Sequence, residues 1–220
     1  GPGISGATSS LPVSLSMGLL SLGGTKTQNF SFYGKIAAGA ALAAVPTVNN
    51  GNTEYSSSFT GAGTLTYAIS VLAAPTNCLG NSASFGFAVK ATAINNCTIT
   101  ATPMAFANAT ILTGSVRSTS TLTVRCVNNN SYQIALNGGT VAANVAARKM
   151  KNTVSAATIN YQLSGTLDGP LWGDGTAGTT MVTGIGTGNS VPVTIYGRVP
   201  AQTTPVPGDY KDTVTATIYF

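Results

Sequence analysis

Apolar and polar residues alternate with a period of two along most of the chain, which is the pattern of β-strands that bury one face. No segment of helical period longer than about two turns stands out, and only residues 141–150 favour a helical turn or two. Strands at short intervals, separated by turns rich in Gly and Asn, predict an all-β sandwich. The alternating segments are residues 11–19, 30–33, 64–69, 85–91, 119–125, 131–136, 158–163, 191–196 and 213–220.

The charged residues are too few for most acid, base and metal chemistry. The 220 residues include 10 Lys and Arg, 5 Asp and Glu and no His, so the side chain that titrates near neutrality and the commonest metal ligand are both missing. The carboxylates are scattered, and we expect no metal, no cofactor and no enzyme, with a Ser–Lys nucleophile pair left open. Residues 184–188 lack the lysine of a phosphate loop and are interpreted as a turn.

The net charge of +5 is spread along the chain. Its only cluster, Arg148, Lys149 and Lys151, is interpreted as a solvated turn, and we expect no nucleic-acid partner. The longest nearly apolar run, residues 36–48, is too short to span a bilayer, so we expect no membrane span. The first residues have no signal-peptide features, which indicates a mature, cleaved or tagged product.

Two of the three cysteines are placed where two strands could bring them together. Cys97 follows one alternating segment and Cys126 ends another, and a bridge between them closes a loop of about 29 residues, worth roughly 3 kcal/mol. Two buried free thiols are the alternative, but a charge-poor surface rich in Ser, Thr and Asn favours an extracellular disulfide. Cys78 is then the cysteine left over, which suggests a free thiol, a disulfide to another chain or a partner cysteine lost by truncation.

The two halves of the chain share a motif. Residues 29–36 (NFSFYGKI) echo residues 192–199 (PVTIYGRV), and a loop containing Pro, a Tyr and a last alternating strand follow each of them. A true repeat predicts that residues 1–84 hold the back half of one β domain and residues 85–220 a whole second copy. Chance similarity between two β-hairpins is the alternative.

Residues 85–220 resemble a known family, and they carry its motifs in the family's order. The motifs are residues 96–106 (NCTITATPMAF), 124–126 (VRC), 132–139 (YQIALNGG), 148–150 (RKM), 160–163 (NYQL), 172–175 (WGDG), 195–199 (IYGRV) and 208–214 (GDYKDTV). They are similar to the spore coat protein U-like pilins of archaic chaperone-usher pili. Residues 1–84 match only around residues 33–36, and a half-domain in this position resembles a two-domain tip adhesin.

The resemblance implies a fold and a mode of assembly. It implies an immunoglobulin-like β-sandwich pilin domain that lacks its final strand, preceded by a partial or small second β-sandwich domain. A periplasmic chaperone, and then a neighbouring pilin subunit, would complete it by adding a strand during export through an outer-membrane usher. The expected product is a structural and adhesive subunit of a pilus at the cell surface, active in attachment and biofilm formation.

A donor strand must carry apolar residues at alternate positions, and two segments do so. The candidates are Phe85, Phe87, Val89, Ala91 and Ala93, and Leu11, Val13, Leu15, Met17 and Leu19. Either could equally be a strand of its own sandwich. Apolar loops predict contact with hydrophobic or host surfaces, through Leu42, Val45, Val48, Val71 and Leu72.

Two other functions remain open. A spore-coat or surface-layer protein with the same fold would assemble without an usher. A carbohydrate-binding sandwich would need exposed aromatic side chains, yet Trp172 is the only tryptophan.

Overall fold

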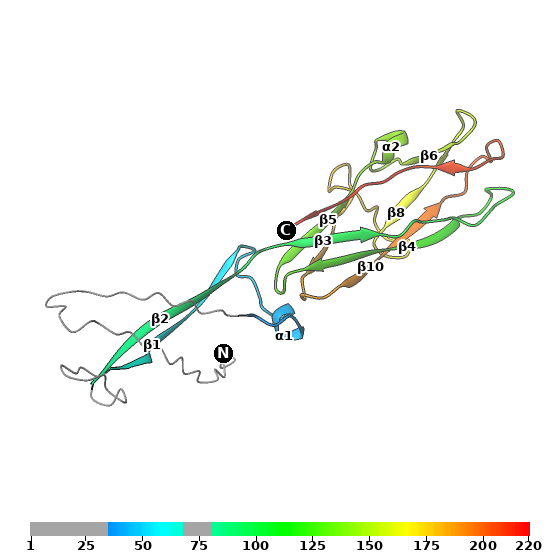
Figure 1. Ribbon diagram of the computed structural model, residues 1–220. Coiled ribbons are helices and arrows are strands. Elements are labelled where there is room, and N and C mark those ends of the chain that lie inside the picture. Colours follow the sequence, from blue (N-terminus) through cyan, green and yellow to red (C-terminus); the bar gives the residue numbers. More distant parts are fainter. Residues whose placement is uncertain (1–34, 68–80) are drawn as a thin grey trace. The chain divides into compact units, whose positions relative to one another are not determined.

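The computed structural model describes residues 35–67 and 81–220 (Figure 1). The described residues fall into two units, which are treated separately here. One contains residues 35–36, 57–67 and 81–89, and the other contains residues 37–56 and 90–220. Neither of the two short helices in the described ranges is long and apolar enough to cross a membrane.

A two-stranded antiparallel hairpin supplies the regular structure of the first unit. It consists of β1 (Thr53–Tyr67) and β2 (Asn81–Ala93), whose last residues continue into the second unit. The rings of Phe59 and Phe87 stack across it with centroids 4.9 Å apart, and Phe85 lies over Gly63, where any side chain would clash with its ring. The apolar stripe of β2 nevertheless stays about half exposed.

The second unit is a sandwich of antiparallel sheets, which confirms the predicted immunoglobulin-like class. One sheet has the order β3-β4-β10-β8, and the other layer is formed by the sheets β12-β5-β9 and β11-β6-β7. The strands are β3 (Cys97–Ala101), β4 (Val116–Cys126), β5 (Ser131–Leu136), β6 (Lys149–Asn152), β7 (Thr158–Asn160), β8 (Gln162–Ser164), β9 (Val182–Ile185), β10 (Val191–Val199), β11 (Tyr210–Lys211) and β12 (Ala216–Tyr219).

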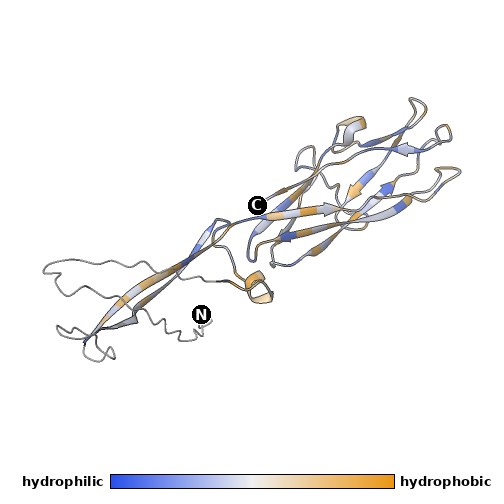
Figure 2. Ribbon diagram, in the orientation of Figure 1, coloured by the Kyte–Doolittle hydropathy of each residue, from blue (hydrophilic) through white to orange (hydrophobic). Residues whose placement is uncertain are grey.

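One apolar core joins the two layers, because alternate residues of each strand point into it. Figure 2 shows this alternation as changes of colour along the strands. In β4, Leu122 and Val124 are each 1% exposed, while Thr123 and Arg125, at the alternate positions, face outward. From the opposite layer, Ile134 is fully buried, and so is Trp172, whose Nε1 donates to the Ile134 carbonyl at 2.8 Å. Trp172 therefore cannot serve as an exposed platform for sugars.

The secondary structure differs from the sequence predictions at four places. The expected single strand of residues 158–163 is two strands in different sheets, divided at the buried Tyr161. The expected turn of residues 184–188 is wrong in its first half, which belongs to β9. In place of a helix within residues 141–150, α2 (Gly139–Ala142) ends early and β6 begins at Lys149; α1 (Ala40–Ala43) was not expected.

The interpretation of Arg148 as part of a solvated turn is also wrong. Arg148 is 1% exposed, and it donates from Nε to the Asn137 carbonyl at 2.8 Å and from Nη2 to the Leu136 carbonyl at 3.0 Å. These carbonyls lie at the end of β5, where the chain turns towards α2 and needs donors. Only Lys149 and Lys151 of the cluster reach solvent.

Candidate strand-binding edge of the sandwich

Two strand edges on one side of the sandwich have no partner within the described residues. β3 pairs only with β4, and β12 pairs only with β5, although the Cα atoms of β3 and β12 approach within 8 Å. In Figure 1 the red C-terminal strand runs on the same side of the sandwich as β3. An unpaired edge presents a row of free backbone N–H and C=O groups to any extended chain.

The burial of apolar side chains falls sharply towards these edges. Ile99 of β3 lies opposite Val124, and Ile218 of β12 lies opposite Ile134, so each pair faces the same core. The inner member of each pair is at most 1% exposed, whereas Ile99 and Ile218 are only partly buried. The core is therefore closed at its centre and open between β3 and β12, where one more strand would cover it.

Two other edges of the same sandwich, those of β7 and β8, are covered by the chain itself. At β7, the side-chain amide of Gln202 accepts from the Asn160 N–H and donates to the Asn160 carbonyl, both at 3.0 Å. At β8, the Trp172 N–H donates to the Leu163 carbonyl at 2.8 Å. No such cover is present along β3 or β12 among the described residues, and neither strand contains a charged residue that would repel an incoming strand.

A disulfide fixes one side of the opening. Cys97 and Cys126 are bonded, as the sequence predicted, and they are direct partners in the register of β3 and β4. The bridge ties the first residue of β3 to the last residue of β4. The edge strand β3 is therefore attached covalently to β4, which contributes to the core.

A buried polar network positions the turn before β12 on the other side. The Asp212 carboxylate accepts hydrogen bonds from the Tyr161 hydroxyl at 2.6 Å and from the N–H groups of Thr140 and Thr213, each at 2.8 Å. Burial, followed by the hydrogen bond to Asp212, raises the pKa of the Tyr161 phenol well above its usual range. Burial lowers the pKa of the neighbouring Arg148 guanidinium. The neutral phenol of Tyr161 thus holds the Asp212 carboxylate in place, four residues before β12 begins.

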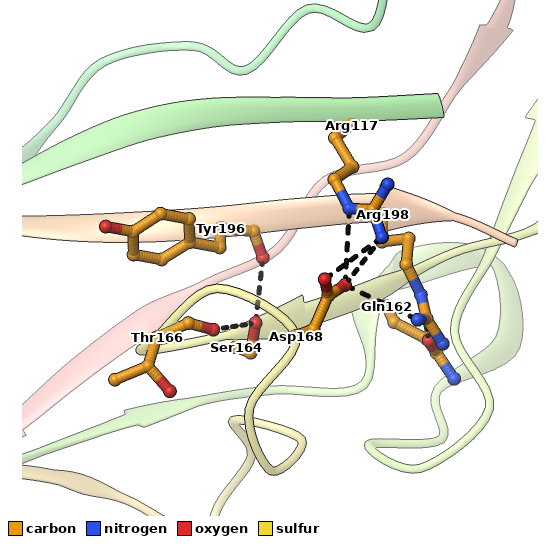
Figure 3. A network of polar contacts seen from close by, with 7 residues as sticks. All are labelled: Arg117, Gln162, Ser164, Thr166, Asp168, Tyr196 and Arg198. Carbon is orange, nitrogen blue, oxygen red and sulfur yellow. Dashed lines mark hydrogen bonds and ion pairs between the residues drawn. The ribbon is translucent and has the colours of Figure 1, made fainter. Parts of the chain in front are cut away.

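Figure 3 shows a second polar network, which lies away from the opening on the outer face of β4, β10 and β8. Asp168 accepts from Arg117 in a bidentate pair and from Arg198 at 3.4 Å, and Gln162 accepts from Arg198 Nε at 3.0 Å. The hollow beside these residues has a volume of about 40 Å³. It has room for little more than a few water molecules. The network attaches the loop that contains Asp168 to β4 and β10, and it does not form a ligand pocket.

The described residues hold no cluster of three or more His, Cys, Asp or Glu side chains that could bind a metal. Asp168 and Asp174, which flank Trp172 in the sequence, have separate roles in their turns. Asp168 takes part in the arginine network. Asp174 accepts from the hydroxyl and the amide of Thr176, and these hydrogen bonds lower its pKa.

None of the donor and adhesion candidates belongs to β3 or β12, and some of them lie outside the described residues. The stripe from Phe85 to Ala93 is on β2, where it is paired with β1. Leu42 and Val48 are exposed and Val45 is partly buried, in a segment tied to the sandwich by hydrogen bonds of Asn128 with Ala44 and Thr47. The candidates outside the described residues are Leu11, Val13, Leu15, Met17, Leu19, Val71 and Leu72.

The register of these edges could not be foreseen from composition. What the sequence does offer is the absence of charge in residues 97–101 and 216–219. Uncharged edge strands are the signal that points to pairing with another chain.

Comparisons with known proteins show the family of this chain. A solved structure that matches part of this chain is that of the CsuC–CsuE chaperone-tip adhesion subunit pre-assembly complex from archaic chaperone-usher Csu pili of Acinetobacter baumannii, at 21% identity and a TM-score of 0.46. The match covers 66% of this chain and 46% of that one, so the chain spans about half of that relative's length. No curated protein matches the sequence. The family model of the Spore Coat Protein U domain matches residues 83–217, which is more than half of the chain. The chain therefore belongs to the Spore Coat Protein U domain family.

Proposed function

We propose that this chain is a structural subunit of an extracellular pilus, exported through the periplasm and joined to its neighbours by strand addition. The opening between β3 and β12 carries the proposal, because it combines two free backbone edges with a partly covered core. A chaperone would occupy the opening before assembly, and a neighbouring pilin would occupy it afterwards. Membership of the Spore Coat Protein U domain family and the pilin-like motifs support this role.

The physical gain from filling the opening has two parts. The added strand would pair its backbone with the free edge of β3 or of β12, and its alternate apolar side chains would be buried beside Ile99 and Ile218. Burial contributes about 25 cal/mol for each Å² of apolar surface, so a donor with four or five aliphatic side chains makes a very long-lived junction. The absence of charge along both edges allows this pairing.

The identity of the donor strand stays a prediction, as does the division of the chain at residues 84 and 85. β2 carries the stripe with Phe85, Phe87 and Val89, but its backbone is already paired with β1 on one side. Residues 83–95 could act as a donor only after leaving that hairpin. Residues 11–19 are the second candidate.

The test uses two synthetic peptides, residues 83–95 and residues 9–21, added to the full chain. A peptide that fills the opening should raise the melting temperature, because a ligand at 100 times its Kd stabilises by about 2.7 kcal/mol. A peptide with Asp in place of its central apolar residue, Val89 or Leu15, should have no effect. If neither unmodified peptide shifts the transition at any concentration, strand acceptance is refuted.

Variants of β12 separate the opening from the rest of the fold. Ile218→Asp should abolish the response to the peptide, because its side chain faces the core beside the proposed strand. Thr217→Asp is the matched control, since Thr217 is exposed on the opposite face of the same strand.

If the chain is a pilus subunit, its export should require an outer-membrane usher. Assembly at the surface of a strain without one would favour the coat or surface-layer role instead.

We also propose that the exposed segment with Leu42, Val45 and Val48 attaches the subunit to hydrophobic or host surfaces and so promotes biofilm formation. Leu42 is 44% exposed and Val48 is 56% exposed, and the hydrogen bonds of Asn128 hold the segment in place. The double change Leu42→Asp and Val45→Asp should reduce attachment to polystyrene while pili still assemble. Val154→Asp is the control, because Val154 is 89% exposed elsewhere. Unchanged attachment by the double variant would overturn this role.

A further inference from the structure

Three lysines gather on the outer face of the sheet β11-β6-β7. Lys149 and Lys151 alternate along β6 with Met150 and Asn152, which are partly or fully buried, so the two lysines point away from the core. Lys211 of β11 is exposed as well. We call Lys149, Lys151 and Lys211 the lysine face.

The register of the sheet places two of these lysines directly opposite each other. Lys211 is the cross-strand partner of Lys151. Directly opposed residues of an antiparallel pair have Cα atoms about 4.5–5.5 Å apart, and like charges in this position destabilise the sheet. Lys149 follows Lys151 at the next position on the same face. The fold therefore concentrates three positive charges where strand pairing alone would favour opposite or neutral ones.

The protein's own carboxylates do not neutralise this face. All five lie in the described ranges, and Glu54 pairs with Lys90 while Asp168 pairs with two arginines. Asp212 holds the network under β12, and Asp174 accepts from Thr176. Asp209 forms no ion pair within 4.0 Å with any lysine or arginine of the described chain. The three ammonium groups are thus left for an external anion.

The neighbouring side chains indicate what kind of anion fits. Thr158 lies opposite Lys151 and Asn160 lies opposite Lys149, and both are exposed. The face therefore combines ammonium groups with a hydroxyl and an amide, which hydrogen-bond sugar hydroxyls well. It has no aromatic side chain on which a base could stack, and three cations are few for a phosphate backbone.

From this combination we propose that the lysine face binds an acidic polysaccharide. Its carboxylates would pair with Lys149, Lys151 and Lys211, and its hydroxyls would bond to Thr158 and Asn160. The proposal goes beyond strand addition and does not depend on it, because the lysine face and the opening are formed by different strands. It gives the pilus subunit a contact with the acidic glycans of a cell surface or biofilm matrix.

The test measures binding of the full chain to immobilised polygalacturonate, with neutral dextran as the uncharged comparison. Changing all three lysines to glutamine should weaken binding about tenfold, since each exposed ion pair contributes a factor of about two to three. Binding of the unchanged protein should also fall as salt is raised, because exposed charges are screened. Dextran should not bind.

Lys90→Gln provides a control that is matched in charge to Lys151→Gln, because Lys90 is exposed but lies outside the lysine face. Equal weakening by the two single changes, or unchanged binding by the triple variant, would overturn the proposal. Tighter lysine-dependent binding to duplex DNA or to anionic lipid vesicles than to polygalacturonate would overturn the choice of partner. Each variant should keep its melting temperature and its response to the donor peptide, so a failure here is distinct from a failure of strand addition.

Discussion

Replacing both bridged cysteines with alanine should lower the free energy of unfolding of the sandwich by about 3.5 kcal/mol. The bridge joins residues 29 positions apart. Closing a loop of that size removes roughly 12 cal/mol/K of chain entropy from the unfolded state, which gives the stated value at 25 °C. Alanine is the better replacement at Cys126, which is 2% exposed, because serine would bury a hydroxyl without a known partner.

Replacing only one of the two cysteines tests the same account. Cys97→Ala and Cys126→Ala each break the whole bridge, so each should cost nearly as much as the double change, and their effects should not add. The loss should also appear locally. β3 is bonded to β4 on one side only, so the amides of residues 98–101 should exchange faster with solvent once the covalent tie is gone.

Urea unfolding, followed by the fluorescence of Trp172, is the appropriate measurement. Trp172 is the only tryptophan in the chain and lies in the core of the sandwich, so its signal reports this unit. Reducing the unchanged protein should bring its midpoint close to that of the double variant. A loss below about 1 kcal/mol, or single effects that add up to the double effect, would refute the entropic account.

Three further predictions concern the buried polar groups. Arg148→Ala should cost about 3 kcal/mol in urea unfolding, because it leaves two carbonyls without their charged donor; a loss near zero would mean that water replaces it. Trp172→Phe should cost about 2 kcal/mol by circular dichroism, since the Ile134 carbonyl loses its N–H donor, and an unchanged midpoint would contradict this. The contribution of Tyr161 to stability should be level below pH 10 and fall above it by up to about 1.4 kcal/mol per pH unit, because unfolded Tyr161 loses its proton near its ordinary pKa while the folded phenol, whose pKa is raised, keeps it. Tyr161→Phe should remove this part of the fall, and an identical pH profile for both proteins would contradict the assignment.

The features that the sequence predicts well are those encoded by local alternation. The strand predicted at residues 131–136 matches β5, and those at 119–125 and 191–196 lie within β4 and β10. In each, every second side chain enters the same core, so the period of two is enough to find it. The disulfide follows for the same reason, because it joins the ends of segments whose pairing could be inferred.

The features that the sequence does not reveal depend on contacts between distant residues. The burial of Arg148 requires the carbonyls at the end of β5, 11 and 12 residues earlier, and no local pattern separates it from the exposed Lys149. The opposition of Lys151 and Lys211 depends on a register between strands about 60 residues apart in sequence. The sequence alone favours a solvated turn for Arg148, Lys149 and Lys151, because it shows only that their charges are adjacent.

The distribution of charge also explains why the opening between β3 and β12 stays available. Soluble proteins protect free strand edges with charged residues, with proline or with a covering loop. This chain covers β7 with Gln202 and β8 with Trp172. β3 and β12 have none of these protections, although they border the least covered part of the core. A chain that protects some of its edges and leaves uncharged the two beside its open core is suited to receive a strand there, and to aggregate if none is supplied.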